Sequence, residues 1–138
     1  MDIRFTNEKG AFSADNCRIV YKNFSGAPTP FNKAGGVKEF ALVIEDPDVV
    51  AQLRGYGYNV REKDSEEGVW YRLPIKIKFN DYGPDCFIKN GRKMTRLDEQ
   101  TIGMLDSIAL ESISIDIRPH AYEINGGGTS AYLSGMCV

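Results

Sequence analysis

One short segment of the chain places a tryptophan and three cations at alternating positions. Trp70, Arg72, Lys76 and Lys78 all stand at even positions between residues 70 and 79. A strand directs every second side chain to the same face, so these four side chains would lie together. Cations follow phosphate groups and a flat ring stacks on a base, which are the two physical requirements for holding a single nucleic-acid strand.

The other positions of the same segment are apolar. They are Tyr71, Leu73, Ile75, Ile77 and Phe79. The segment therefore reads as a half-buried strand with one core face and one basic face that includes a tryptophan. A solvated strand with a half-exposed tryptophan fits the pattern equally well, so the alternation by itself does not decide between binding and plain solvation.

Charge is distributed unevenly along the chain. The formal net charge of −2 argues against a polyanionic ligand, because phosphate binding relies on Lys and Arg. Residues 70–96, however, contain seven basic and only two acidic residues, whereas residues 97–116 contain five acidic residues and no basic one. This asymmetry predicts a basic face on an acidic protein. It also leaves open a second hypothesis, a structural or protein-interaction module such as a virion component or inhibitor, with an acidic surface between Asp98 and Asp116.

No motif for catalysis, for a metal or for a cofactor is present in the sequence. The three cysteines are far apart and form no Cys-x-x-Cys pair, so we expect reduced, buried thiols. His120 is the only histidine and has no nucleophile or carboxylate motif beside it. The glycines at 126–128 lack the lysine of a phosphate-binding loop and do not open a helix. We therefore expect a protein that is not an enzyme and needs no cofactor.

Strand signals dominate the rest of the chain. The expected strands are residues 3–5, 17–22, 37–44, 56–61, 70–79, 86–89, 92–95, 110–118 and 129–138. Asp46-Pro47 predicts the start of a short helix that ends near Gly55, and residues 97–105 predict another short helical turn. Residues 23–36 read as a long loop and residues 62–68 as a flexible charged segment.

Three further sequence features predict a turn, the end of a strand and an irregularity within a strand. Asn90-Gly91 predicts the turn of a hairpin, because both residues tolerate a positive φ angle. Pro119 is expected to end the strand before it, and Gly135 to make the last strand irregular.

Length and composition indicate one globular domain, residues 1–138. Apolar residues make up 42% and charged residues 26% of the chain, and no apolar run approaches the ~20 residues that cross a bilayer. The N-terminus lacks the apolar core of a signal peptide, so we expect a cytoplasmic protein. Short, unevenly spaced strands with one or two short helices and a long early loop favour a mainly β fold, a small barrel rather than a sandwich.

Several stretches together resemble a family of phage-encoded single-stranded DNA-binding proteins. They are Asn23-Phe24-Ser25-Gly26, Phe31-Asn32, Phe40-Ala41-Leu42-Val43-Ile44, Gly57-Tyr58-Asn59-Val60, Leu73-Pro74-Ile75-Lys76-Ile77, Leu105-Asp106, Ile115-Asp116-Ile117-Arg118-Pro119 and Gly128-Thr129-Ser130-Ala131-Tyr132-Leu133. In order and spacing these stretches cover most of the chain.

The resemblance implies a five-stranded OB-type barrel with extra strands that binds single-stranded DNA without sequence preference during phage replication or recombination. It implies the cytoplasm of a bacterial host, no cofactor, and replication or recombination proteins as further partners. We expect a monomer or homodimer. Such proteins commonly recruit partners through an acidic tail. This sequence ends at Met136-Cys137-Val138, and recruitment through a tail is not predicted.

The predicted DNA-contacting set combines the basic face, the long loop and other basic or aromatic positions. Its members are Lys22, Phe24, Phe31, Lys33, Tyr58, Trp70, Arg72, Lys76, Lys78, Arg118 and Tyr122. Taken one at a time, the aromatic residues other than Trp70 are more typical of a core than of a binding surface.

Overall fold

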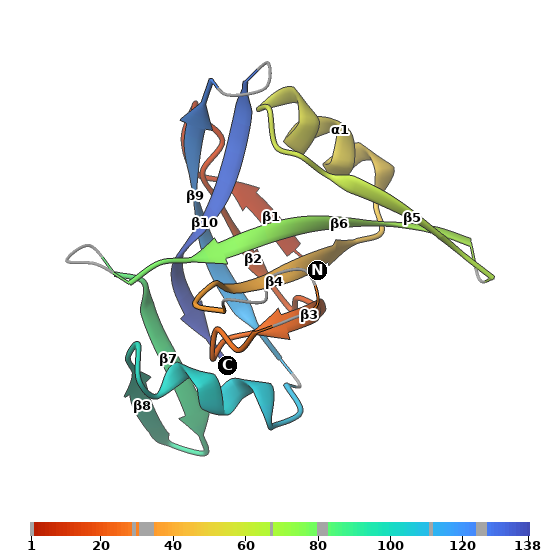
Figure 1. Ribbon diagram of the computed structural model, residues 1–138. Coiled ribbons are helices and arrows are strands. Elements are labelled where there is room, and N and C mark those ends of the chain that lie inside the picture. The colour runs from red at the N-terminus through yellow and green to blue at the C-terminus, as the bar shows by residue number, and fades with distance from the viewer. Residues whose placement is uncertain are drawn as a thin grey trace.

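A computed structural model describes residues 2–28, 30, 35–66, 68–79, 83–110, 112–123 and 127–138 (Figure 1). The strands in this part of the chain are β1 (Asp2–Phe5), β2 (Phe12–Asp15), β3 (Ile19–Asn23), β4 (Lys38–Ile44), β5 (Arg61–Ser65), β6 (Gly68–Ile77), β7 (Asp85–Asn90), β8 (Lys93–Leu97), β9 (Ser114–Tyr122) and β10 (Gly128–Cys137). One α-helix, α1 (Pro47–Gly55), and one 3₁₀ helix, η1 (Ile102–Asp106), accompany them. No helix in the described ranges is long and apolar enough to span a bilayer.

The strands form one highly branched sheet. Its main path runs β1-β2-β9-β10-β6-β4-β3, while β5 pairs with β6, and β7 pairs with both β10 and β8. Strand β10 is antiparallel to β9 and parallel to both β6 and β7. The predominance of strands confirms the predicted mainly β class. No pairing joins the edge strands β1 and β3 within the described residues, so closure of the sheet into a barrel is not confirmed.

A single hydrophobic cluster joins nearly all of these elements. Leu73, Ile75 and Ile77 of β6 are buried in it, as the alternation predicted, together with Ile115 and Ile117 of β9. Burying a large aliphatic side chain is worth about 1.5–3 kcal/mol, so the inner face of β6 holds this strand firmly in register.

Helix α1 forms where its capping signals predicted it. The Asp46 carboxylate accepts a hydrogen bond from the Asp48 amide at 2.9 Å, and Pro47 occupies the first turn. Val50 and Leu53 are the buried residues that attach the helix to the core. The predicted helical turn in residues 97–105 is also confirmed, as η1.

The strand predicted at residues 56–61 is wrong. Gly57 has a φ of +91°, which interrupts an extended backbone, and Tyr58 makes only an isolated bridge to Thr129. The strand β5 begins instead at Arg61, in a segment predicted to be flexible. Charged residues form a strand here because they pair antiparallel with β6, from Arg61 opposite Arg72 to Ser65 opposite Gly68.

Two further predictions need correction and one strand was missed. The turn between β7 and β8 consists of Gly91 and Arg92 rather than Asn90-Gly91, because Asn90 pairs with Lys93. Strand β9 continues through Pro119. The pairing of β9 with β2 extends only as far as Ile117, which lies opposite Phe12. The missing N–H of Pro119 therefore disrupts no pairing with β2. The short strand β2 carried too few alternating residues to be recognised.

The last strand behaves as predicted at Gly135. The pairing of β10 with β9 shifts register between Leu133 and Gly135. This irregularity lies between the part of β10 that pairs with β6 and the part that pairs with β7.

The cysteines are unpaired thiols, two of them buried. Burial raises the pKa of Cys17 to about 11 and that of Cys86 to about 12, which keeps both protonated and unreactive near neutrality. Cys137 is only partly buried.

The start of the long loop is held by one carboxylate. Asp106, the last residue of η1, accepts hydrogen bonds from the Phe24 amide at 2.8 Å and from the Ser25 amide at 3.0 Å. The Phe24 ring is fully buried against Phe40, at 5.5 Å between ring centroids. Asp106 thus holds the chain where it enters the core, at the residue that follows β3.

We predict that Asp106→Asn destabilises the protein by about 1–3 kcal/mol, because one of the two amides then faces an NH₂ group and is left without an acceptor. Urea unfolding followed by circular dichroism measures this loss. Glu99→Gln, an exposed carboxylate on the same segment, is the control and should leave the free energy of unfolding within about 0.5 kcal/mol of the native value. Equal stability of the two variants would show that Asp106 does not anchor the loop.

Candidate nucleic-acid interface

The outer face of β6 carries the residues that alternation placed there. Trp70 and Arg72 are partly exposed and Lys76 is exposed, on the side of the strand opposite the buried Leu73 and Ile75. Lys78 is also exposed and follows the end of the strand. The prediction of a basic face with a tryptophan is confirmed as a feature of the structure.

A second aromatic ring, Tyr21, joins this face from β3. Its side chain is 53% exposed, and the Lys63 ammonium donates a 2.6 Å hydrogen bond to its hydroxyl oxygen. The Arg72 guanidinium lies 5.0 Å from the Tyr21 ring centroid, and Lys63 lies 5.7 Å from that of Trp70. Two rings and two cations from three strands therefore form one aromatic–cation cluster, Tyr21, Lys63, Trp70 and Arg72.

An unusual backbone conformation accompanies the exposure of Tyr21. Its φ is +53°, and the pairing of β3 with β4 shifts register between Val20 and Asn23. A bulge of this kind re-aims side chains. The hydrogen bond and cation contact from Lys63, together with the lesser effect of Arg72, lower the pKa of the Tyr21 hydroxyl.

A third ring, Tyr132 of β10, extends the same face. Tyr132 lies opposite Lys76 in the parallel pairing and opposite Arg118 in the antiparallel one. The Arg118 guanidinium lies 5.2 Å from the Tyr132 ring centroid, and His120 packs edge-on to this ring at 5.7 Å. The neighbouring pair Ala131 and Ile75 is buried, so Tyr132 and Lys76 point away from the core.

These residues make up one surface, which we call the interface strip. Its members are Tyr21, Lys63, Trp70, Arg72, Lys76, Arg118 and Tyr132. Beside it lies a groove of about 640 Å³ next to Trp70, lined by Arg18, Val20 and Val43 among others. The strip combines rings and cations from five strands, β3, β5, β6, β9 and β10.

Three of the predicted contact residues lie elsewhere. Phe24 is fully buried and Tyr58 is 3% exposed, so neither ring offers a face to a base. The Tyr58 hydroxyl donates to the Gly10 carbonyl at 2.7 Å, and burial raises its pKa to about 12. Lys22 donates to the carbonyls of Leu105 and Ile108, at 2.8 and 2.6 Å. All three have structural roles, and we leave them out of the strip.

The remaining predicted residues divide in two. Tyr122 is 36% exposed at the end of β9, four residues beyond Arg118 and on the same face. Phe31 and Lys33 lie outside the described residues.

Three strip residues were missed from the sequence. Tyr21 lay in a predicted strand, but the bulge that exposes it leaves no mark in the residue pattern. Lys63 lay in a segment that was interpreted as flexible. Tyr132 lay in the predicted final strand, but the sequence does not reveal that this strand pairs Tyr132 with Lys76 and Arg118.

Several acidic residues at 97–116 have partners within the chain. Asp98 accepts hydrogen bonds from the Thr101 side chain and backbone, Asp106 holds the loop, and Asp116 accepts from Ser13. These bonds give the carboxylates structural roles that do not require a protein partner.

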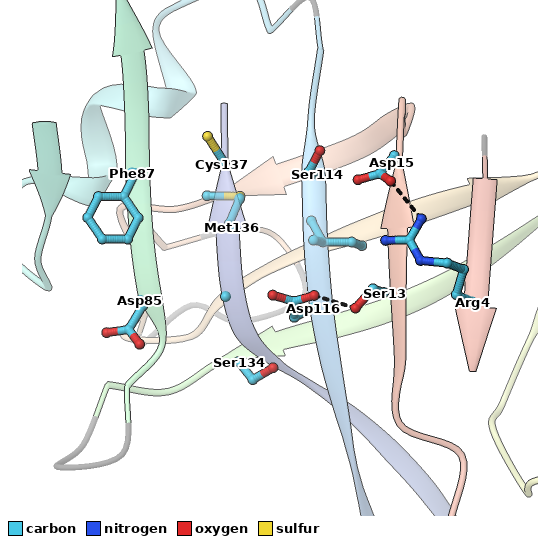
Figure 2. Close-up of a pocket in the computed structure, with 12 residues that line it drawn as sticks. Arg4, Ser13, Asp15, Asp85, Phe87, Ser114, Asp116, Ser134, Met136 and Cys137 are labelled. Carbon is cyan, nitrogen blue, oxygen red and sulfur yellow. Dashed lines mark hydrogen bonds and ion pairs between the residues drawn. The ribbon is translucent and has the colours of Figure 1, made fainter. Parts of the chain in front are cut away.

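The Asp116 carboxylate also lines a pocket on the same sheet face, farther along β10 (Figure 2). Ser13 donates a 2.5 Å hydrogen bond to Asp116, and Arg4 forms a 2.8 Å ion pair with Asp15. Dashed lines mark both interactions in Figure 2. The carboxylates of this pocket make it a poor site for a phosphate group.

An exposed strip of rings and cations on a mainly β sheet is typical of proteins that bind single-stranded nucleic acids. Residues 5–138 match the family described as "Putative phage ssDNA-binding domain", and the chain belongs to this family. No curated protein is similar enough to the chain to match it.

Solved structures of a single-stranded DNA-binding protein from bacteriophage Enc34 have a similar fold. Its complex with single-stranded DNA superposes with a TM-score of 0.55 at 17% identity, covering 94% of this chain and 86% of that one. Its C-terminal truncation gives 0.57 at 16% identity, covering 94% and 85%. At this level of identity the similarity concerns the fold.

We predict that Lys63→Met raises the pKa of the Tyr21 hydroxyl, because the variant removes the hydrogen bond and positive charge that favour the phenolate. NMR titration of protein labelled with ¹³Cζ-tyrosine follows this pKa directly. Lys78→Met, which removes a lysine outside the cluster, should leave it unchanged. An unaltered Tyr21 titration in Lys63→Met would contradict the contact.

Proposed function

We propose that this protein binds single-stranded DNA along the interface strip, without sequence preference and without catalysing a reaction. The observation that carries the proposal is the contact of Tyr21, Trp70 and Tyr132 with cations of neighbouring strands on one exposed face. Every base has a π face, so stacked rings hold any sequence, while Lys and Arg accompany the phosphates.

Local charge explains how an acidic protein attracts a polyanion. The net charge is −2, but the strip contains Lys63, Arg72, Lys76 and Arg118 and no carboxylate. Glu39 pairs opposite Lys76 and Glu45 lines the groove, so the favourable potential is confined to the strip. Binding confined to a narrow basic path suits a flexible single strand better than a rigid duplex.

Membership of the phage family and the fold shared with the Enc34 protein support this proposal. We further propose that the chain forms a single OB-type barrel domain, in which the curved sheet closes without continuous pairing, and acts in the bacterial cytoplasm during phage replication or recombination. Proteins of those processes are its proposed partners, and the chain works as a monomer or homodimer.

We predict that Trp70→Ala and Tyr21→Ala each weaken binding of a fluorescent oligo(dT) roughly 5- to 150-fold, the equivalent of about 1–3 kcal/mol per stacked base. Fluorescence anisotropy at several salt concentrations measures the affinity. Met104→Ala, which truncates an exposed side chain outside the strip, is the control and should bind as the native protein does.

Two results would contradict the proposal. One is an affinity of the native protein that does not change with salt, because phosphate contacts release counterions. The other is native affinity in both aromatic variants.

A further inference from the structure

A second concentration of positive charge lies outside the interface strip, on the β7–β8 hairpin. Lys89, Arg92, Lys93 and Arg96 are all exposed there, within eight residues of one another. Asp85 is the only carboxylate of the two strands, and it is bonded to Arg96 at 2.5 Å. Lys89 lies on the same face of the hairpin as Arg96, Lys93 lies on the opposite face, and Arg92 is in the turn.

The outer face of this hairpin also carries apolar groups. Phe87 pairs with Arg96, whose guanidinium lies 5.8 Å from the ring centroid, and Lys89 pairs with Met94, which is 55% exposed. The opposite face is anchored by the buried pair Cys86 and Leu97. The hairpin thus repeats the combination of ring and cation that defines the strip.

Strand register places this face on the same side of the sheet as the strip. Phe87 pairs with Cys137 of β10, and Cys137 pairs with Ser114 of β9. Ser114 and Arg118 both alternate with the buried isoleucines of β9, so they share the face that points away from the core. From Tyr132 to Cys137 the path along β10 is about 17 Å, at roughly 3.3 Å per residue.

Two of the three carboxylates between the two basic regions are in ion pairs. Figure 2 shows the pairing of Asp15 with Arg4 and the hydrogen bond that Asp116 accepts from the neutral Ser13 hydroxyl. Asp85 is paired with Arg96. A DNA strand crossing this stretch would meet two ion-paired carboxylates and one, Asp116, whose hydrogen-bond partner is a neutral hydroxyl.

Positive charge on an edge strand such as β8 also discourages edge-to-edge aggregation. That role accounts for Lys93 and Arg96. It does not account for Lys89, which lies on the inner strand of the hairpin, or for an aromatic ring under Arg96 and an exposed methionine beside it.

We propose that the β7–β8 hairpin is a second DNA contact, which binds the part of a single strand that extends past Tyr132. This inference rests on the proposed function of the strip. Short oligonucleotides occupy the strip alone, whereas longer ones reach both surfaces and gain affinity because the second contact is intramolecular.

The test compares Lys89→Gln with the native protein on oligo(dT) of about 6 and about 20 nucleotides, the first within and the second beyond the usual site sizes of about 4–16 nucleotides. The variant leaves the Arg96–Asp85 pair in place. On the long oligonucleotide, the slope of log K against log salt should become shallower by about 0.7, the value for one lost phosphate contact. On the short oligonucleotide, the affinity and the salt slope of the variant should equal those of the native protein. Lys9→Gln, an exposed lysine of the β1–β2 turn, controls for loss of charge at a distance.

Each failure has a separate signature. If the variant has the native salt slope on both oligonucleotides, or loses the same amount of slope on both, the hairpin contact is overturned while the proposed binding along the strip stands. Failure of the native protein to bind either length would overturn the proposed function itself. Native DNA binding together with lost affinity for a synthetic Asp/Glu-rich peptide would identify the hairpin as a protein contact and overturn this inference.

Discussion

Burial of the inner face of β6 is the constraint on which the rest of the structure depends. This strand pairs with β4, β5 and β10, and it contributes Leu73, Ile75 and Ile77 to the core. Side chains alternate strictly along a strand, so the buried residues also determine which residues face outward. A slip of one residue would bury Arg72 and Lys76 and expose the isoleucines, a change the core does not tolerate. The stability of the fold and the proposed binding surface both follow from the register of β6.

The strands beside β6 complete the surface that this register begins. Tyr132 and Arg118 arrive through pairing of β10 with β6 and β9, and Lys63 arrives through the β5–β6 hairpin. Tyr21 comes from β3 with a φ of +53°. A tyrosine with a positive φ angle costs of order 1–3 kcal/mol of conformational free energy, so the conformation persists only where the surrounding structure holds it. Such residues are common at functional sites. Here the bulge and the contacts from Lys63 and Arg72 hold it.

The sequence predicted the features that are local. Alternation identified both faces of β6, capping residues located α1, and Gly135 marked the register shift in β10. What it could not supply is pairing between distant segments. The charged residues of β5 form a strand because they pair with β6, and this pairing is not evident from their types. Isolated rings were ambiguous for the same reason, since nothing in the residue types distinguishes the buried Phe24 and Tyr58 from the exposed Tyr21.

NMR of the protein labelled at its tyrosine rings and tryptophan indole, titrated with oligo(dT), tests the central claim most directly. Trp70 is the only tryptophan, so its indole signal is unambiguous. The interface strip predicts large shifts for Trp70, Tyr21 and Tyr132 as DNA is added, and an unchanged signal for the buried Tyr58. Saturable binding that leaves Trp70, Tyr21 and Tyr132 unshifted would contradict the account, because the DNA would then lie on another face of the molecule.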